Sequence, residues 1–151
     1  MIKVIYLSAV PQFLPLIANW IHHEFWSPDV PVQVLLALLQ NHLAGPQIPL
    51  TLVAMADEQP VGTVSLIEND VKEKPDLRPW LAALYVLPEY RQQGVGSQLV
   101  SAVCAAAQRL GERTLYLSAV EEVNFYARRG WQVIETNVGP HHLSIMQISL
   151  V

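Results

Sequence analysis

The chain has 151 residues, of which 52% are hydrophobic and 15% are charged, and its formal net charge at pH 7 is −4. This length favours a single domain (residues 1–151) that buries a full core, and the composition excludes a disordered chain. The absence of a basic run argues against a nucleic-acid partner, and no apolar run approaches the roughly 18 residues that a membrane span needs.

Two further features bear on the compartment. The N-terminal segment Met1–Tyr6 alternates like a strand and lacks the charged region and cleavage site of a signal peptide. The only cysteine, Cys104, falls on the apolar side of a predicted helix, so we expect a buried, unreactive thiol and no disulfide. These features favour a cytoplasmic protein without membrane attachment.

Hydrophobic spacing and Gly/Pro positions predict the elements in chain order. The predicted elements are a strand at residues 2–8, a helix that starts around Pro11 and Pro15 and ends near Phe25, a helix at 32–43, strands at 50–56 and 61–67, an acidic loop at 68–79, a strand at 81–87, a helix that ends before Gly111, a strand at 114–119, a short helix at 121–129, and closing strands at 131–135 and 142–150.

The stretch from Leu81 to Ser97 reads as a strand, a turn and a loop that opens directly into a helix. The loop contains Arg91-x-x-Gly94-x-Gly96. Glycines let a ligand approach the backbone, and a helix N-terminus offers free N–H groups and partial positive charge. The loop therefore predicts an anion site, with a phosphate as the most common ligand.

Two common phosphate-binding motifs do not fit this loop. The dinucleotide fingerprint G-x-G-x-x-G lacks its third glycine here, and no Lys follows either glycine as a nucleotide P-loop requires. The string "LYVLPEYR", which ends at Arg91, and the string "GSQLV", which begins at Gly96, are instead similar to the pyrophosphate-binding signature of the GNAT superfamily of acyl-CoA N-acyltransferases. The segment from Asn124 to Trp131 also resembles that family's Phe-Tyr-x-x-x-Gly-aromatic motif.

The resemblance implies an α/β (α+β) fold in one N-acetyltransferase domain. A mixed central sheet of about seven strands would be flanked by about four helices, in the order strand, helix, helix, three strands, helix, strand, helix, two strands. It implies acetyl-CoA (coenzyme A) as the cofactor. It also implies that the strand at 81–87 splays from the strand at 114–119 and opens a wedge for the thioester.

The resemblance further assigns site residues. Backbone groups of the strand would pair with the pantetheine arm, and those of the loop would cradle the pyrophosphate. The cofactor-binding residues are then Leu84, Tyr85, Val86, Arg91, Gln92, Gln93, Gly94, Val95, Gly96, Ser97 and Asn124. Tyr126 would protonate the leaving sulfur; packing between helix and sheet is the alternative for this side chain. Many relatives carry an Asn seven residues before this Tyr, where this chain has Ala119.

The general base and the acceptor site are less defined. Carboxylates that end the strand at 61–67 or begin the short helix are candidate bases through a water, or solvated surface charges: Glu68, Asp70, Glu121 and Glu122. The acceptor side is expected to include His23, Glu24, Trp26, Glu68, Asp70 and Trp80. Neither His22–His23 nor His141–His142 has the spacing of a metal motif, so we expect no metal.

The leading hypothesis is an acetyl-CoA-dependent N-acetyltransferase that acts by direct transfer on a primary amine of a small molecule, as a monomer or homodimer. An alternative acceptor is a protein N-terminus or lysine. Two hypotheses belong to other functional classes: a non-catalytic acyl-CoA-binding or sensor module, and a nucleotide-binding module.

Overall fold

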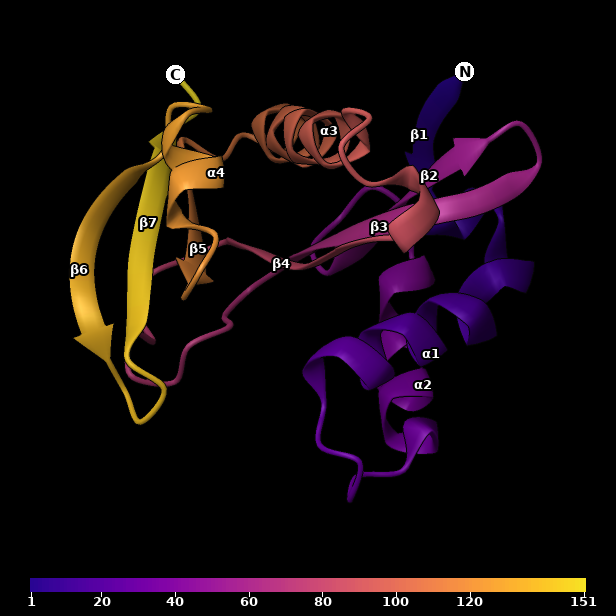
Figure 1. Cartoon of the computed structure of the whole chain (residues 1–151), viewed down its shortest axis with the longest axis horizontal. Coiled ribbons are helices and arrows are strands. Elements are labelled where there is room, and N and C mark those ends of the chain that lie inside the picture. The colour runs from indigo at the N-terminus through magenta and orange to yellow at the C-terminus, as the bar shows by residue number, and fades with distance from the viewer.

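The computed structural model describes residues 1–151 as a seven-stranded sheet with helices on both faces (Figure 1). The strands are β1 (Ile2–Tyr6), β2 (Leu50–Ala56), β3 (Gln59–Ile67), β4 (Trp80–Val86), β5 (Thr114–Ala119), β6 (Gln132–Val138) and β7 (Leu143–Ser149), and the helices are α1 (Leu14–Phe25), α2 (Val32–Gln40), α3 (Val95–Arg109) and α4 (Val123–Ala127). Short 3-10 turns occupy Leu7–Ala9, Pro11–Phe13, Asn41–Leu43 and Pro88–Tyr90. No helix combines the length and apolar character needed to cross a membrane.

The predicted fold class and element order are confirmed, with shifts at the ends of elements. The second helix gives way to a 3-10 turn at residues 41–43, and β3 begins at Gln59 because only Asp57 and Glu58 form the turn. The short helix covers Val123–Ala127 rather than 121–129. The closing hairpin turns at residues 139–142, so β6 runs on through Asn137, which adopts a left-handed φ of 57°.

The sheet order is β1-β2-β3-β4-β5-β7-β6, and every neighbouring pair is antiparallel except β4–β5. These two strands run parallel and pair at one position only, Trp80 with Tyr116. Beyond it β4 bends, since Ala83 has a φ of 56° and the β3–β4 register shifts between Thr63 and Ser65. A bulge of this kind twists a strand away from its neighbour. The predicted splay between these strands is therefore present.

Burial on both faces of the sheet explains why β2 is apolar at every position except Thr51. Leu50, Leu52 and Ala54 belong to the core beneath α3, whereas Val53 and Met55 pack with α1 and α2 on the opposite face. Alternate residues of a strand point to opposite faces, so a sheet covered on both faces buries both sets.

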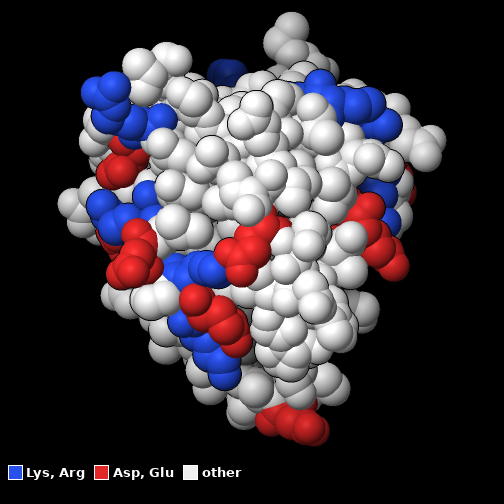
Figure 2. Space-filling model, turned by 90° about the vertical axis from the view of Figure 1, so that its left-hand side faces the viewer, with Lys and Arg blue, Asp and Glu red and all other residues white.

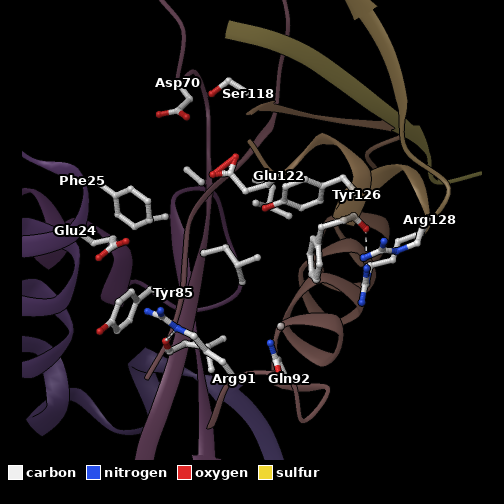
Figure 3. Close-up of a pocket in the computed structure, with 18 residues that line it drawn as sticks. Glu24, Phe25, Asp70, Tyr85, Arg91, Gln92, Ser118, Glu122, Tyr126 and Arg128 are labelled. Carbon is white, nitrogen blue, oxygen red and sulfur yellow. Dashed lines mark hydrogen bonds between the residues drawn. The ribbon is translucent and has the colours of Figure 1, made fainter. Parts of the chain in front are cut away.

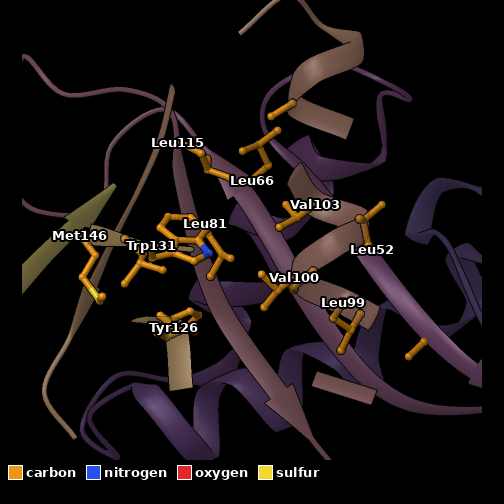
Figure 4. Close-up of a cluster of buried hydrophobic side chains, with 14 of the residues drawn as sticks. Leu52, Leu66, Leu81, Leu99, Val100, Val103, Leu115, Tyr126, Trp131 and Met146 are labelled. Atoms are coloured by element: carbon orange, nitrogen blue, oxygen red, sulfur yellow. The ribbon is translucent and has the colours of Figure 1, made fainter. Parts of the chain in front are cut away.

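Helix α3 links the two halves of the sheet across the splay. Its fully buried Leu99 belongs to one cluster with Leu81 on β4 and Leu115 on β5, and Tyr126 and Trp131 of the same cluster lie beside Leu81 (Figure 4). Side-chain packing under α3 thus holds β4 and β5 together, although their backbones pair at only one position.

Leu99→Ala should lower the free energy of unfolding by about 2–5 kcal/mol, because it empties space at the centre of this cluster. Urea denaturation followed by circular dichroism measures the change. Gln98→Ala, at the exposed neighbouring position of α3, serves as the control and should stay within about 0.5 kcal/mol of the parent. A loss below about 1 kcal/mol for Leu99→Ala would contradict the central place of this side chain.

Candidate functional site

A cavity of about 640 Å³ lies where β4 and β5 separate (Figure 3). Its walls come from β4, the loop before α3, the start of α3, the end of β5, α4 and the C-terminal end of α1. Segments from residue 24 to residue 129 therefore meet at one hollow, which makes it the strongest candidate for a functional site.

The edge of β4 that faces the cavity carries free backbone groups. The Leu87 amide donates to the Val61 carbonyl (2.9 Å), so Leu87 bonds toward β3. Because bonding direction alternates along a strand, the groups of Val86 face the other way, toward the cavity. There the Val86 carbonyl accepts a hydrogen bond from Nε of Arg91 (2.9 Å), whose guanidinium carbon lies 5.6 Å from the centre of the Tyr85 ring. One edge group of β4 is thus bonded to a side chain instead of to a neighbouring strand.

The N-terminus of α3 presents unpaired amides. Gln92 and Gly94 adopt left-handed φ values of 62° and 84°. The Gln98 amide donates to the Gly94 carbonyl (3.0 Å), and the amides of the three residues before it, 95–97, precede the first bonded amide of the helix. This geometry suits an anion, as the glycine pattern predicts.

Helix α4 places Tyr126 between core and cavity. The side chain is 6% exposed and packs edge-on against Trp131, while its hydroxyl points into the cavity (Figure 3). Desolvation raises the pKa of Tyr126 well above its usual range, the negative charge of Glu122 raises it further, and Arg129 opposes both. The hydroxyl therefore keeps its proton throughout the physiological range.

The Arg129 side chain connects α4 to the start of α3. Its Nε donates to Oγ of Ser97 (2.7 Å), its Nη1 donates to the Phe125 carbonyl (2.6 Å), and its guanidinium carbon lies 3.7 Å from the centre of the Phe125 ring. The edge of that ring is 3.4 Å from the position that a Cβ on Gly96 would occupy. A side chain at residue 96 would press on Phe125 and fill part of the cavity.

Three carboxylates line the cavity, those of Glu24, Asp70 and Glu122. Oε2 of Glu122 accepts hydrogen bonds from the amides of Val120 and Glu121 (3.2 Å each). Surrounding protein raises the pKa of Asp70 by desolvation, although the residue stays in part open to solvent. Outside the cavity, on the face that carries β6, acidic and basic side chains are interspersed (Figure 2).

The expected acceptor residues divide into two groups. Glu24 and Asp70 line the cavity, whereas the other four do not. Glu68 forms a salt bridge with Arg78 (2.6 Å). Trp80 is fully buried in a cluster with Val71 and Val138, and its Nε1 donates to the Leu77 carbonyl (2.6 Å).

His23 is exposed on the last turn of α1, and Trp26 packs with the cluster beneath α1 and α2. Periodicity did not distinguish Trp26 from the neighbouring Phe25, which does line the cavity.

The expected cofactor residues also differ in placement. Those that line the cavity are Leu84, Tyr85, Val86, Arg91, Gln92 and Gly96. Val95, the first residue of α3, is buried in the core, and Ser97 accepts a hydrogen bond from Arg129. The exposed residues outside the cavity wall are Gln93, Gly94 and Asn124.

Sequence reasoning did not assign Ser118, Phe125, Arg128 or Arg129 to the site, although all four line the cavity. The only indication in the sequence is that these residues lie within a few positions of Tyr126 or at the end of β5. Basic side chains are common at the end of any helix because they interact favourably with its dipole, so the two arginines carry no specific signal in the sequence.

A second groove of about 520 Å³ runs along the other side of α3 and includes Cys104. The thiol is half-buried, and desolvation raises the pKa of Cys104 to about 11. The Trp131 Nε1 is the one buried side-chain polar atom without a hydrogen-bond partner. No three His, Cys, Asp or Glu side chains gather closely enough to hold a metal ion.

Comparison with known proteins places this geometry among acetyltransferases. Residues 16–131 match the model of the Acetyltransferase (GNAT) family. The amino-acid acetyltransferase of Aeromonas salmonicida is 34% identical over 55 residues, a match that spans 36% of this chain and 12% of that protein.

Solved structures of low sequence identity share the whole fold. A GNAT-family protein from Desulfovibrio desulfuricans superposes with a TM-score of 0.78 at 18% identity, covering all of both chains. A GNAT-family acetyltransferase from Staphylococcus aureus Mu50 gives 0.74 at 19%, again over all of both chains. A Salmonella typhimurium protein solved with its cofactor acetyl-CoA gives 0.71 at 20%, over 100% of this chain and 95% of that one.

Cys104 should react slowly with iodoacetamide at pH 8, because a pKa of about 11 leaves roughly one thiol in a thousand ionised at that pH. The alkylation rate, followed by mass spectrometry, should rise about tenfold per pH unit between pH 7 and 10. Cys104→Ser should remove all labelling. A rate that levels off below pH 9 would show an ordinary, solvated thiol.

Proposed function

The chain belongs to the acetyltransferase (GNAT) family, and we propose that it moves an acetyl group from acetyl-CoA to a primary amine of a small molecule by direct transfer. The observation that carries the proposal is the splay of β4 from β5 after the bridge of Trp80 to Tyr116. It leaves a strand edge, a helix N-terminus and a tyrosine hydroxyl around one cavity.

The binding groups fit an elongated donor with a phosphate end. Amides 95–97, with the left-handed Gly94 before them and Arg91 at the mouth, would hold the pyrophosphate. The free edge of β4 at Leu84–Val86 would pair with the pantetheine arm as an added strand does. Arg91 would then release the Val86 carbonyl, to which it now donates. When bound, acetyl-CoA supplies the activated acetyl thioester.

Tyr126 is proposed as the acid. Its hydroxyl faces the cavity and stays protonated, so it has a proton to give to the departing sulfur. Amide groups of β4 beside the bulge at Ala83 would face the oxyanion that forms during transfer.

Glu122 is proposed as the group that accepts the proton of the incoming amine, directly or through a water. Its negative charge raises the pKa of Tyr126, and its carboxylate lies on the side of the cavity toward which the Tyr126 hydroxyl points (Figure 3), which supports this role. Oε2 is bonded to two loop amides, which orients the carboxylate and leaves Oε1 for the amine. Among the four candidate bases from the sequence, Glu68 is paired with Arg78 and Glu121 lies outside the cavity wall.

Acetyl-CoA and CoA should each raise the melting midpoint by roughly 5–10 °C when present at about one hundred times their dissociation constants, and ATP should not. Gly96→Trp should abolish the shift, because an indole at this position displaces Phe125 and fills the cavity. Thermal unfolding with each ligand measures both effects.

Gln33→Trp provides the matched control, since it adds the same side chain at an exposed position of α2. It should keep the full shift, and both variants should show parental circular dichroism. If neither acetyl-CoA nor CoA shifts the parent, or if folded Gly96→Trp responds like the parent, the proposed donor site is wrong.

Tyr126→Phe should lower kcat by about a hundredfold and change KM for acetyl-CoA by less than about threefold, because a proton donor acts mainly in the transition state. Steady-state thiol release with a reactive amine measures both constants. Tyr116→Phe, beside Trp80 and outside the cavity, is the control and should keep parental kcat. Unchanged kcat in Tyr126→Phe would assign this side chain to packing alone.

A further inference from the structure

The charged groups of the cavity separate into a basic end and an acidic end. Arg91 lies at the glycine loop, and Arg128 and Arg129 lie on the turn that follows α4, on the same side as the unpaired amides of α3. Asp70 lies at the opposite end, with Glu122 between it and the tyrosine, and Glu24 lies on the α1 side of the cavity, nearer to Tyr85 and Arg91 (Figure 3). Under the proposed function the basic end faces the donor's phosphates, so the acidic end faces the acceptor.

The acidic end is assembled from three separate segments. Glu24 lies in the last turn of α1, Asp70 lies in the loop between β3 and β4, and Glu122 immediately precedes α4. The fold brings them to one hollow from positions almost one hundred residues apart in the chain. They are therefore a property of the assembled cavity and not of one charged segment.

No cation of the chain compensates these carboxylates. The two salt bridges of the protein join Lys74 to Glu135 and Arg78 to Glu68 and involve none of the three. No lysine lines the cavity, and its three arginines belong to the basic end or to the Ser97–Phe125 contact. All three residues are solvent-exposed, so their charges need no partner within the chain, and together they attract a cationic ligand.

We propose that the acceptor is a small aliphatic amine with a second protonated nitrogen, a diamine or polyamine. The reacting nitrogen would lie beside Glu122 and Tyr126, and the second nitrogen would be held by Glu24 and Asp70. The half-exposed ring of Phe25, at 51% exposure, offers apolar surface for the carbon chain between them. The inference rests on the proposed acetyl transfer and names its substrate class.

The charge change during the reaction fits this division of roles. Acetylation removes the positive charge from the reacting nitrogen only. The second nitrogen stays protonated before and after transfer, so its carboxylate partners position the substrate throughout. An acceptor with a carboxylate at that end would instead meet like charge, which opposes binding.

The test compares three amines of the same chain length that differ only at the far end: 1,4-diaminobutane, butylamine and 4-aminobutyrate. Acetylation is followed by thiol release and by the mass of the product. The diamine should exceed butylamine in kcat/KM by at least about tenfold, and 4-aminobutyrate should react most slowly. The diamine's advantage should shrink as salt is added, because screening weakens the attraction.

Asp70→Asn and Glu24→Gln should each reduce the ratio of kcat/KM for diamine to butylamine by about threefold to tenfold, mainly through a higher KM for the diamine. Asp76→Asn, which removes a carboxylate from the same loop outside the cavity wall, should leave the ratio unchanged. The thermal shift with acetyl-CoA is measured for every variant to confirm an intact donor site.

The outcomes separate this inference from the proposed function. Equal turnover of butylamine or 4-aminobutyrate would overturn the diamine assignment and leave acetyl transfer standing. Binding of acetyl-CoA without turnover of any of the three amines would also overturn the diamine assignment. Absence of both acetyl-CoA binding and turnover would overturn the proposed function itself.

Discussion

Hydrogen bonding between β4 and β5 stops after one bridge, and the arrangement of the site depends on that interruption. Buried backbone groups need partners, so a parted pair of strands is tolerated only where something else satisfies their edges. Here Arg91 bonds one carbonyl of the β4 edge, and the α3 side chains around Leu99 hold the two halves of the sheet together. The protein can therefore contain a cavity bordered by polar backbone groups while its hydrophobic core stays continuous.

The opening is also electrically asymmetric. Arg91 lies at the glycine-loop end of the cavity, Asp70 and Glu122 lie at the other end, and the hydroxyl of Tyr126 lies between them (Figure 3). The proposed reaction, from a polyanionic donor to a cationic acceptor, would be served by this arrangement, because each substrate would be attracted to its own end of the cavity.

Much of the fold and part of the site follow from local sequence patterns. Strand and helix order follows from periodicity, and the Arg91-x-x-Gly94-x-Gly96 loop indicates an anion site because glycine spacing is a local property. The bulge at Ala83 was out of reach, since alanine has no preference for a left-handed φ and tertiary packing imposes it. The burial of Trp80 and the pairing of Glu68 with Arg78 depend on how a twelve-residue loop crosses the sheet, which composition does not encode.

The free edge of β4 and the amides at the start of α3 have an evolutionary consequence. Every residue except proline carries the same N–H and C=O, so a ligand held by such groups places few demands on side-chain identity. What must persist is a backbone path, set at a few points such as the left-handed turn at Gly94 and the bulge at Ala83. Most of the surrounding sequence is then free to change while the proposed donor site persists, and under that proposal a new acceptor preference would need only a few side-chain substitutions elsewhere in the cavity.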